Sequence, residues 1–233
     1  MSKPIVFAHR GASAIRFENT MKAFEKAVEQ GTDGIELDVQ VTEDGVPIVI
    51  HDADLVRLAG VRRMISSLTS TEIADIRVGG KYTRLVNGHP IPTLIEAVAF
   101  CEKHHLALNV ELKETVSARP EFVERILDSV SYLDSMHISS FDYHLLEEVK
   151  KVDARVETGY LIRKNSVDWD HLERYVYADG FHIHKKLLKE PYVSKLIQSG
   201  KKIRVYGMTG LEAIAHNPPS YIDGWITDYP DRF

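Results

Sequence analysis

The sequence predicts an α/β protein and, within that class, a (β/α)8 TIM barrel. From Pro92 onward, segments with the pattern of strands alternate regularly with segments with the pattern of helices. Such alternation is typical of parallel strands joined by helices, and the eight strand segments counted from the N-terminus suffice to close a barrel. No linker or low-complexity tract divides the 233 residues. We therefore expect one TIM-barrel domain over 1–233, with a small insertion near 53–92.

The N-terminal part predicts one strand, one helix and a long irregular stretch. Residues 5–8 form a short apolar run that leads into a polar loop. Asn19 can cap a helix that ends near Gly31. Residues 53–92 show no regular period, and we expect one short helix in them, opened by the capping box Thr69-x-x-Glu72.

Residues 34–52 predict a strand followed by a hairpin extension. Apolar and polar residues alternate in the first half, which is typical of a half-buried strand, and Asp44-Gly45 is expected to form a two-residue turn. In that register Asp38 faces His51 across the ladder, about 5 Å away. A slip by one residue would separate Asp38 from His51 and set Val41 against a proline, so the apolar pattern favours the first register.

The rest of the chain supplies the regular part of the predicted barrel. The capping box Thr93-x-x-Glu96 opens a helix, and a strand follows over 106–112. Further helices are expected near 119–132, 141–151, 167–177, 191–199 and 210–216. Further strands are expected near 136–140, 157–162, 180–184, 202–206 and 223–227. Because only a few residues follow the last strand, either the insertion or a second subunit should cover that flank, which leaves a homo-oligomer as one of two alternatives.

Composition excludes several classes of partner. A net charge of −5 and a pI near 6.1 argue against binding to nucleic acid or to an anionic membrane surface. The single cysteine, Cys101, excludes an internal disulfide and fits a reducing compartment. No signal peptide or spanning segment is visible, so we expect a cytoplasmic protein without stable membrane insertion.

The predicted strand ends gather polar and charged side chains, and in such barrels catalytic groups lie at the carboxyl ends of the strands. These residues are His9, Arg10, Glu36, Asp38, Glu111, Lys113, Ser139, Ser140, His184, Tyr206 and Asp228, with His51 added by the hairpin. Random strand ends would be mostly small or apolar. The concentration of histidine and acid therefore predicts a functional site here.

The residue types at these ends indicate phosphoryl chemistry at a divalent cation. Three carboxylates from two strands suit Mg²⁺ or Ca²⁺, whereas zinc would call for paired His or Cys ligands. Arg10 and Lys113 add positive charge of the kind that phosphoryl groups require, and His9 and His51 can share general acid and base duties. The alternatives without catalytic function are an exposed acidic hairpin, a His9 that hydrogen-bonds to a loop, and an ion pair between Lys113 and Glu111 alone.

Motifs along nearly the whole chain resemble the glycerophosphodiester phosphodiesterase family. They are His9-Arg10-Gly11, Glu18-Asn19-Thr20, Glu36-x-Asp38, Asp44-Gly45, His51-Asp52, Glu111-x-Lys113 and Asp223-Gly-x-Ile-Thr-Asp228-x-Pro230. The resemblance implies a barrel with a divalent metal held by Glu36, Asp38 and Glu111, and His9 and His51 as the acid–base pair. It also implies phosphate binding by Arg10 and Lys113, an orienting role for Asp52, and support from Glu18 and Asn19.

Two positions depart from the family pattern. Phe17 stands where the family usually has proline, and the seventh strand ends in Tyr206-Gly-Met-Thr where the family usually has Trp-Thr-Val-Asn. Because that aromatic residue normally lines the substrate pocket, Tyr206 is expected to bind substrate, and the choice of leaving group is the property most open to change.

The expected function is metal-dependent hydrolysis of a small-molecule glycerophosphodiester, such as glycerophosphocholine or glycerophosphoethanolamine, to glycerol 3-phosphate and an alcohol. The nucleophile is either water or the glycerol 2-hydroxyl. One alternative is a lysophospholipase D acting on single-chain lipids, with an apolar entry surface formed by Leu55, Val56, Leu58, Val61 and Ile65. Two others are a non-catalytic barrel that binds phosphorylated ligands and an enolising enzyme with Lys113 as base.

Overall fold

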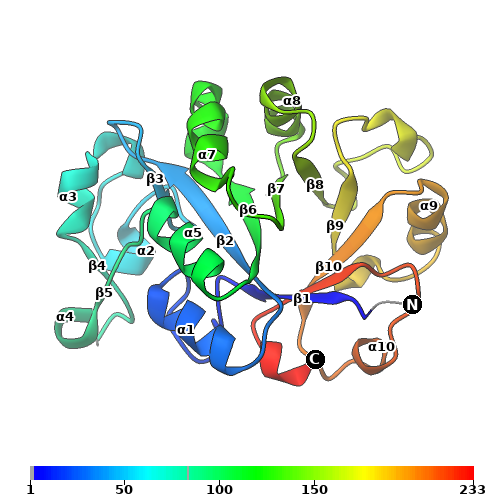
Figure 1. Ribbon diagram of the computed structural model, residues 1–233, viewed down its shortest axis with the longest axis horizontal. Helices are drawn as coiled ribbons and strands as arrows, with labels where there is room; N and C mark the ends of the chain where they lie inside the picture. Colours follow the sequence, from blue (N-terminus) through cyan, green and yellow to red (C-terminus); the bar gives the residue numbers. More distant parts are fainter. Residues whose placement is uncertain (1–2, 83) are drawn as a thin grey trace.

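The computed structural model describes residues 3–82 and 84–233 and, within them, contains a closed barrel of eight parallel strands (Figure 1). The strands are β1 (Ile5–His9), β2 (Gly34–Val41), β6 (Ala107–Leu112), β7 (Met136–Ser140), β8 (Glu157–Ile162), β9 (Gly180–His184), β10 (Lys202–Met208) and β11 (Gly224–Thr227). Each strand pairs with the next in this order, and β1 pairs with both β2 and β11, which closes the barrel. The predicted (β/α)8 TIM barrel is confirmed.

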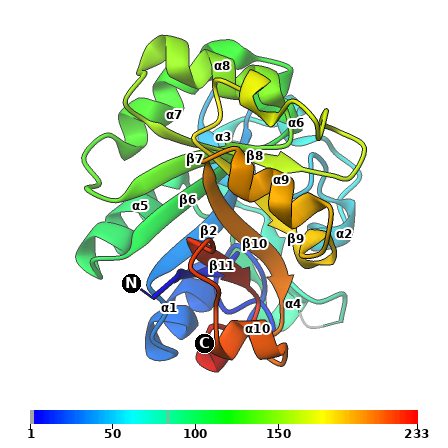
Figure 2. The ribbon, with the colours of Figure 1, turned by 90° about the vertical axis from the view of Figure 1, so that its right-hand side faces the viewer.

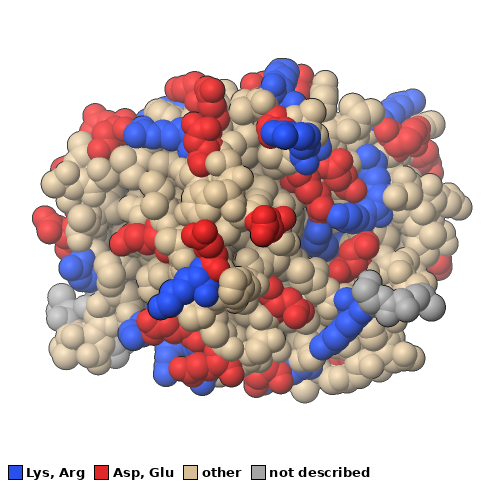
Figure 3. Space-filling view, viewed as in Figure 1, with Lys and Arg blue, Asp and Glu red and all other residues tan. Residues whose placement is uncertain are grey.

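Helices surround the strands, as Figure 2 shows from the side. They are α1 (Met21–Glu29), α5 (Leu94–Lys103), α6 (Glu114–Ser117), α7 (Val123–Val130), α8 (Tyr143–Val152), α9 (Tyr192–Gln198) and α10 (Ala213–His216), with the 3₁₀ turns η2 (Pro120–Phe122) and η4 (Lys185–Leu187). Among the described residues, none of the helices has the length and apolar character needed to cross a membrane. On the face in Figure 3, acidic and basic side chains are interspersed.

Strand β2 shows how packing of one strand face against the helices directs acidic side chains into the barrel interior. Ile35, Leu37 and Val39 are fully buried in the apolar cluster that contains residues of α1 and α5 outside the strands. Because successive side chains of a strand point to opposite faces, Glu36 and Asp38 point inward. The burial of one face of β2 thus fixes the position of two carboxylates.

The insertion between β3 (Pro47–Val49) and α5 is more structured than expected. It contains α2 (Val56–Ala59), η1 (Ile65–Ser67), α3 (Ser70–Ala74), α4 (Arg84–Asn87) and a small sheet of β4 (Arg77–Val78) and β5 (His89–Pro90). The predicted capping box at the start of α3 is present. The expectation of a single helix was wrong, because short apolar stretches without a long period still fold when they share a core.

That core removes the basis for a lipid entry surface. Leu55, Leu58 and Ile65 are buried together with Ile48 and Ile50 of the hairpin, in a cluster at the β3 edge of the barrel. Of the five residues that the lysophospholipase alternative requires, only Val56 is exposed. Most of these apolar side chains of the insertion therefore pack within its own core.

The hairpin has the register that the sequence disfavoured. Strand β3 is antiparallel to β2, and Val41 pairs with Pro47. The turn has three residues rather than two, since Thr42 and Val46 close it and Gly45 adopts a φ of +78°. The Asp44 carboxylate accepts hydrogen bonds from Thr42 and from Ser70 of α3. This contact with the insertion, invisible locally in the sequence, fixes the turn.

Two helix predictions also need correction. Asn19 does not cap α1; Thr20 does, accepting a hydrogen bond from the Ala23 amide. No α-helix forms over 167–177, where the described chain has only the 3₁₀ turn η3 (Leu172–Arg174). There the Trp169 indole donates to the Lys164 carbonyl and the Asp168 amide donates to the Tyr175 hydroxyl, so side chains hold the segment in an irregular form.

The flank after β11 carries only the 3₁₀ turn η5 (Pro230–Arg232). Phe233 packs there against Trp225, with ring centroids 6.1 Å apart. In the described chain the apolar cluster of the insertion contains no residue of this flank, so the insertion does not cover it. A covering second subunit stays a prediction.

The floor of the barrel contains a buried basic cluster. His137, His182 and Arg204 are all buried, and the two imidazole rings lie 5.2 Å apart. The Arg204 guanidinium donates to Glu157 at 2.6 Å. Burial, reinforced by the charge of Arg204, lowers the pKa of both histidines well below its usual value. Both are therefore neutral in the native barrel.

These histidines should make the fold sensitive to acid. The unfolded chain has ordinary histidine pKa values near 6.5, so below that pH it binds more protons than the native state, and the free energy of unfolding falls as pH falls. Each histidine contributes up to about 1.4 kcal/mol per pH unit. When urea unfolding is measured between pH 7 and 5, the free energy of unfolding should fall less steeply with pH in His182→Leu and His182→Gln than in the wild type. The exposed control His144→Gln should keep the wild-type slope; equal slopes in all four proteins would contradict the prediction.

Candidate active site

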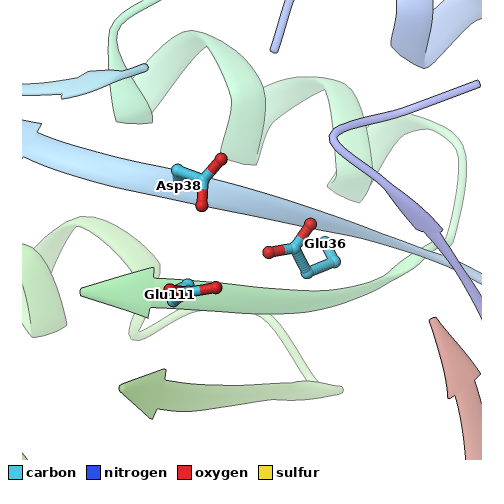
Figure 4. Close-up of side chains that lie close together, drawn as sticks. All are labelled: Glu36, Asp38 and Glu111. Atoms are coloured by element: carbon cyan, nitrogen blue, oxygen red, sulfur yellow. The ribbon is translucent and has the colours of Figure 1, made fainter. Parts of the chain in front are cut away.

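Three buried carboxylates meet inside the carboxyl end of the barrel. Glu36 and Asp38 lie two residues apart on β2, and Glu111 lies on the adjacent strand β6, in register with Asp38 (Figure 4). One oxygen of each lies within 4.8 Å of one oxygen of each of the others. None of the three is more than 5% exposed. The arrangement follows from the pleat of two parallel strands.

The electrostatics of this cluster fit a divalent cation. Burial, together with the charges of Asp38 and Glu111, raises the pKa of Glu36 to about 7, and burial with the Asp38 charge raises the pKa of Glu111. The ionised forms of these two carboxylates are thus disfavoured by burial and by like charge, and a bound cation would relieve both. A hard cation such as Mg²⁺ or Ca²⁺ takes oxygen ligands of this kind, so the three residues present fit a divalent metal.

Two cations neutralise Asp38, one at each carboxylate oxygen. Arg10 Nε lies 2.9 Å and Lys113 Nζ 2.8 Å from its carboxylate. Burial alone would raise the pKa of Asp38, but the charges of Lys113 and Arg10 outweigh it and lower that pKa. Lys113 also pairs with Glu111. Burial lowers the pKa of Lys113, but the charges of Asp38 and Glu111 outweigh it and raise that pKa. Because Lys113 is held as an ammonium, it is unsuited to act as an enolising base.

The loop after β1 positions Arg10 through strained backbone. Arg10 has a φ of +58°, a region that side-chain-bearing residues rarely adopt. Its amide donates to the Glu36 backbone carbonyl at 2.7 Å and lies 3.0 Å from the Glu36 carboxylate. Asn19, also at positive φ, donates its side-chain amide to Asp38 at 2.7 Å. The residue expected to cap a helix instead orients an acid of the site.

Each of the two site histidines is held by an aspartate. His9 Nδ1 lies 2.6 Å from Asp228, and His51 Nδ1 lies 2.7 Å from Asp52. An ionised carboxylate only accepts hydrogen bonds, so each Nδ1 carries the proton and each Nε2 is left for other partners. Burial lowers the pKa of His9, but the charge of Glu36 and the bond to Asp228 outweigh it and raise that pKa. The sequence places Asp228 at a strand end and in the last family motif, but does not predict its bond to His9.

Sequence reasoning missed Arg57 of α2. Its guanidinium bonds Glu18 through two nitrogens, both at 2.9 Å, and Asp52 through two nitrogens, at 2.7 and 2.9 Å. Glu18 in turn accepts from Arg10 at 2.9 Å. One arginine of the insertion therefore connects the partner of His51 with the partner of Arg10. A half-exposed helix arginine gives no sequence signal of such a role.

Several of the site's charged side chains line one pocket of about 230 Å³. Its lining residues are His9, Arg10, Glu36, His51, Asn109, Glu111, Lys113, Phe141, Leu161, Tyr206 and Ile226. The structure therefore brings most of the predicted site residues together, Tyr206 included. Ser139 and Ser140 bond Asn109 and the Leu112 carbonyl instead, so they support the strands.

A closed parallel barrel with buried acids, two histidines and two cations at its carboxyl end is the arrangement expected of an enzyme that acts on phosphoryl substrates. Residues 9–232 match the sequence profile of the Glycerophosphoryl diester phosphodiesterase family. The chain belongs to this family and is a phosphoric diester hydrolase that converts glycerophosphodiesters to glycerol 3-phosphate.

Individual relatives cover almost the whole chain. The glycerophosphodiester phosphodiesterase of Caldanaerobacter subterraneus subsp. tengcongensis is 31% identical, over 98% of this chain and 96% of that protein. The crystal structure of the glycerophosphodiester phosphodiesterase of Thermotoga maritima has a TM-score of 0.81 at 30% identity, covering 99% of this chain and 97% of the other. A phosphodiesterase of Oleispira antarctica, solved in complex with the product sn-glycerol-3-phosphate, has a TM-score of 0.87 at 26% identity, covering 98% and 94%.

Proposed function

We propose that the chain hydrolyses glycerophosphodiesters at a divalent cation, Mg²⁺ or Ca²⁺, with His9 and His51 as the acid–base pair and residues 1–233 acting as one domain. The observation that carries the proposal is the pocket itself, in which two aspartate-bound histidines share a lining with two of three clustered carboxylates. Glu36, Asp38 and Glu111 would hold the cation. When bound, it would neutralise charge on the phosphate.

The side chains divide the remaining work by position. Arg10 and Lys113 bind phosphate oxygens, since both stand beside the acid cluster and both line the pocket. One histidine takes a proton from the attacking hydroxyl through Nε2, and the other donates a proton to the departing alkoxide. Asp228 and Asp52 fix the tautomers and stabilise the imidazolium that forms. The same pair serves either nucleophile: water gives glycerol 3-phosphate directly, whereas the glycerol 2-hydroxyl gives a cyclic phosphate that water then opens to glycerol 3-phosphate.

The first test is cation binding. Calorimetry with Mg²⁺ and with Ca²⁺ should show one site in the wild type and none in Glu36→Ala, because two carboxylates are left to hold the ion. Glycerol 3-phosphate release from glycerophosphocholine and glycerophosphoglycerol should stop with chelator. The control Glu72→Ala, at a surface acid of α3, should bind as the wild type does. Undiminished release in chelator would refute the metal requirement.

The second test is the acid–base pair. His9→Ala and His51→Ala should each lower kcat by about two to four orders of magnitude, the range for general acid or base groups. Cation affinity should stay within about threefold of the wild type, which separates this loss from damage to the acid cluster. His144→Ala, at an exposed histidine of α8, serves as the control. Near-normal turnover in either site variant would sink the assignment.

The third test concerns Arg57. Arg57→Ala should lower kcat by about tenfold or more, in the range for residues that orient site groups, and leave KM nearly unchanged, because it frees Asp52 and Glu18 without removing a substrate contact. The matched control is Arg63→Ala, since Arg63 pairs with Glu72 in the same insertion. Equal kinetics in both variants would show that the insertion does not position the site.

A further inference from the structure

The pocket has an aromatic wall beside its acids and histidines. Phe141 follows β7, Leu161 is the next-to-last residue of β8 and Tyr206 lies on β10, and all three line the pocket. The Phe141 and Tyr206 rings meet edge to face with centroids 6.5 Å apart. On its other side Tyr206 packs against His184, with centroids 5.3 Å apart. This wall is the apolar side of the pocket.

Arg163 covers the outer end of this wall. It follows β8 directly, is exposed, and places its guanidinium 4.5 Å from the centroid of the Phe141 ring. Within residues 3–82 and 84–233 the side chain of Arg163 makes no ion pair or hydrogen bond, and the same holds for the side chains of Lys164, which also follows β8, and Lys186, which lies in η4 after β9. Lys185 is neutralised by Glu212 at 2.6 Å. The rim beside the wall is therefore positively charged.

The two halves of a diester have different needs at this pocket. With the phosphate between Arg10 and Lys113, the glycerol hydroxyls need hydrogen-bond partners, which lie on the side of the acids and histidines. The wall offers one hydroxyl, that of Tyr206, and burying unpaired hydroxyls against it would be costly. The alcohol half is therefore the part that runs along Phe141 and Tyr206 toward Arg163.

We infer that Arg163 selects the alcohol half of the substrate by charge, favouring alcohols that carry a carboxylate or phosphate and disfavouring quaternary ammonium alcohols such as choline. The inference rests on the proposed reaction. An aromatic face can bind a quaternary ammonium group, but at Phe141 the guanidinium already occupies it. A guanidinium, by contrast, pairs well with carboxylate and phosphate groups.

The test compares three glycerophosphodiesters that differ in the charge of the alcohol. They are the choline diester, its uncharged 3,3-dimethylbutyl isostere, and the diester of 3-hydroxypropanoate, which carries a carboxylate. Choline and its isostere share a shape, so their difference in kcat/KM reports charge alone. The wild type should prefer the carboxylate diester over the isostere, and the isostere over choline. Raising the salt concentration should compress this order.

The variants are Arg163→Met and Arg163→Glu. Arg163→Met should narrow the difference in kcat/KM between choline and its isostere, and Arg163→Glu should invert the order and shift the ratio of carboxylate to choline by about tenfold, the scale for a charge reversal at a solvated site. Arg155→Glu is the matched control: Arg155 precedes β8 at the opposite end of the same strand and is 91% exposed. It should keep the wild-type order.

Separate outcomes overturn the inference and the reaction. Hydrolysis of all three diesters with choline preferred, or with ratios unmoved by Arg163→Glu, refutes the charge selection and leaves the phosphodiesterase standing. No hydrolysis of any diester refutes the reaction. In that case, calorimetric affinities of the three diesters for His51→Asn, which retains the wall and Arg163, decide the charge order without turnover: equal affinities refute it.

Discussion

The burial of Asp38 is the constraint on which the rest of the site depends. A fully buried carboxylate is costly unless charges and hydrogen bonds surround it. Here the compensation comes from two segments: Arg10 and Asn19 belong to the loop after β1, and Lys113 follows β6. Each of those segments must therefore hold a fixed position for the barrel to tolerate this acid. The catalytic geometry and the stability of the carboxyl end are two consequences of one electrostatic requirement.

That requirement reaches the insertion through salt bridges. Arg10 bonds Glu18, Glu18 bonds Arg57, and Arg57 bonds Asp52, the partner of His51. Because charges alternate along this path, each group reduces the desolvation cost of the next. The insertion, which buries its own apolar residues, thus contributes a charged face to the barrel. This explains how a segment without catalytic groups is attached to the site.

Most of the barrel could be predicted because its signals are local: strand periodicity and two capping boxes each depend on a few neighbouring residues. Failures fall where distant contacts decide. The hairpin register depends on Ser70 bonding Asp44, 26 positions away, and the His9 partner Asp228 lies 219 positions away. Arg57 meets Glu18 across 39 positions. No local pattern encodes these pairs. The motifs, by contrast, named most of the charged residues that line the pocket from the sequence alone.

The two sides of the pocket are under different physical control. On one side, buried charges bind one another so tightly that changing a single residue leaves another uncompensated, which keeps the chemistry constant. On the other side, Phe141 and Arg163 directly follow strands and Tyr206 lies on β10, and these residues contact one another through ring faces and edges. Substitutions there leave no buried charge without a partner. Head-group preference can therefore drift among barrels that share the acids, and the departure at Tyr206 lies on the side where such drift costs least.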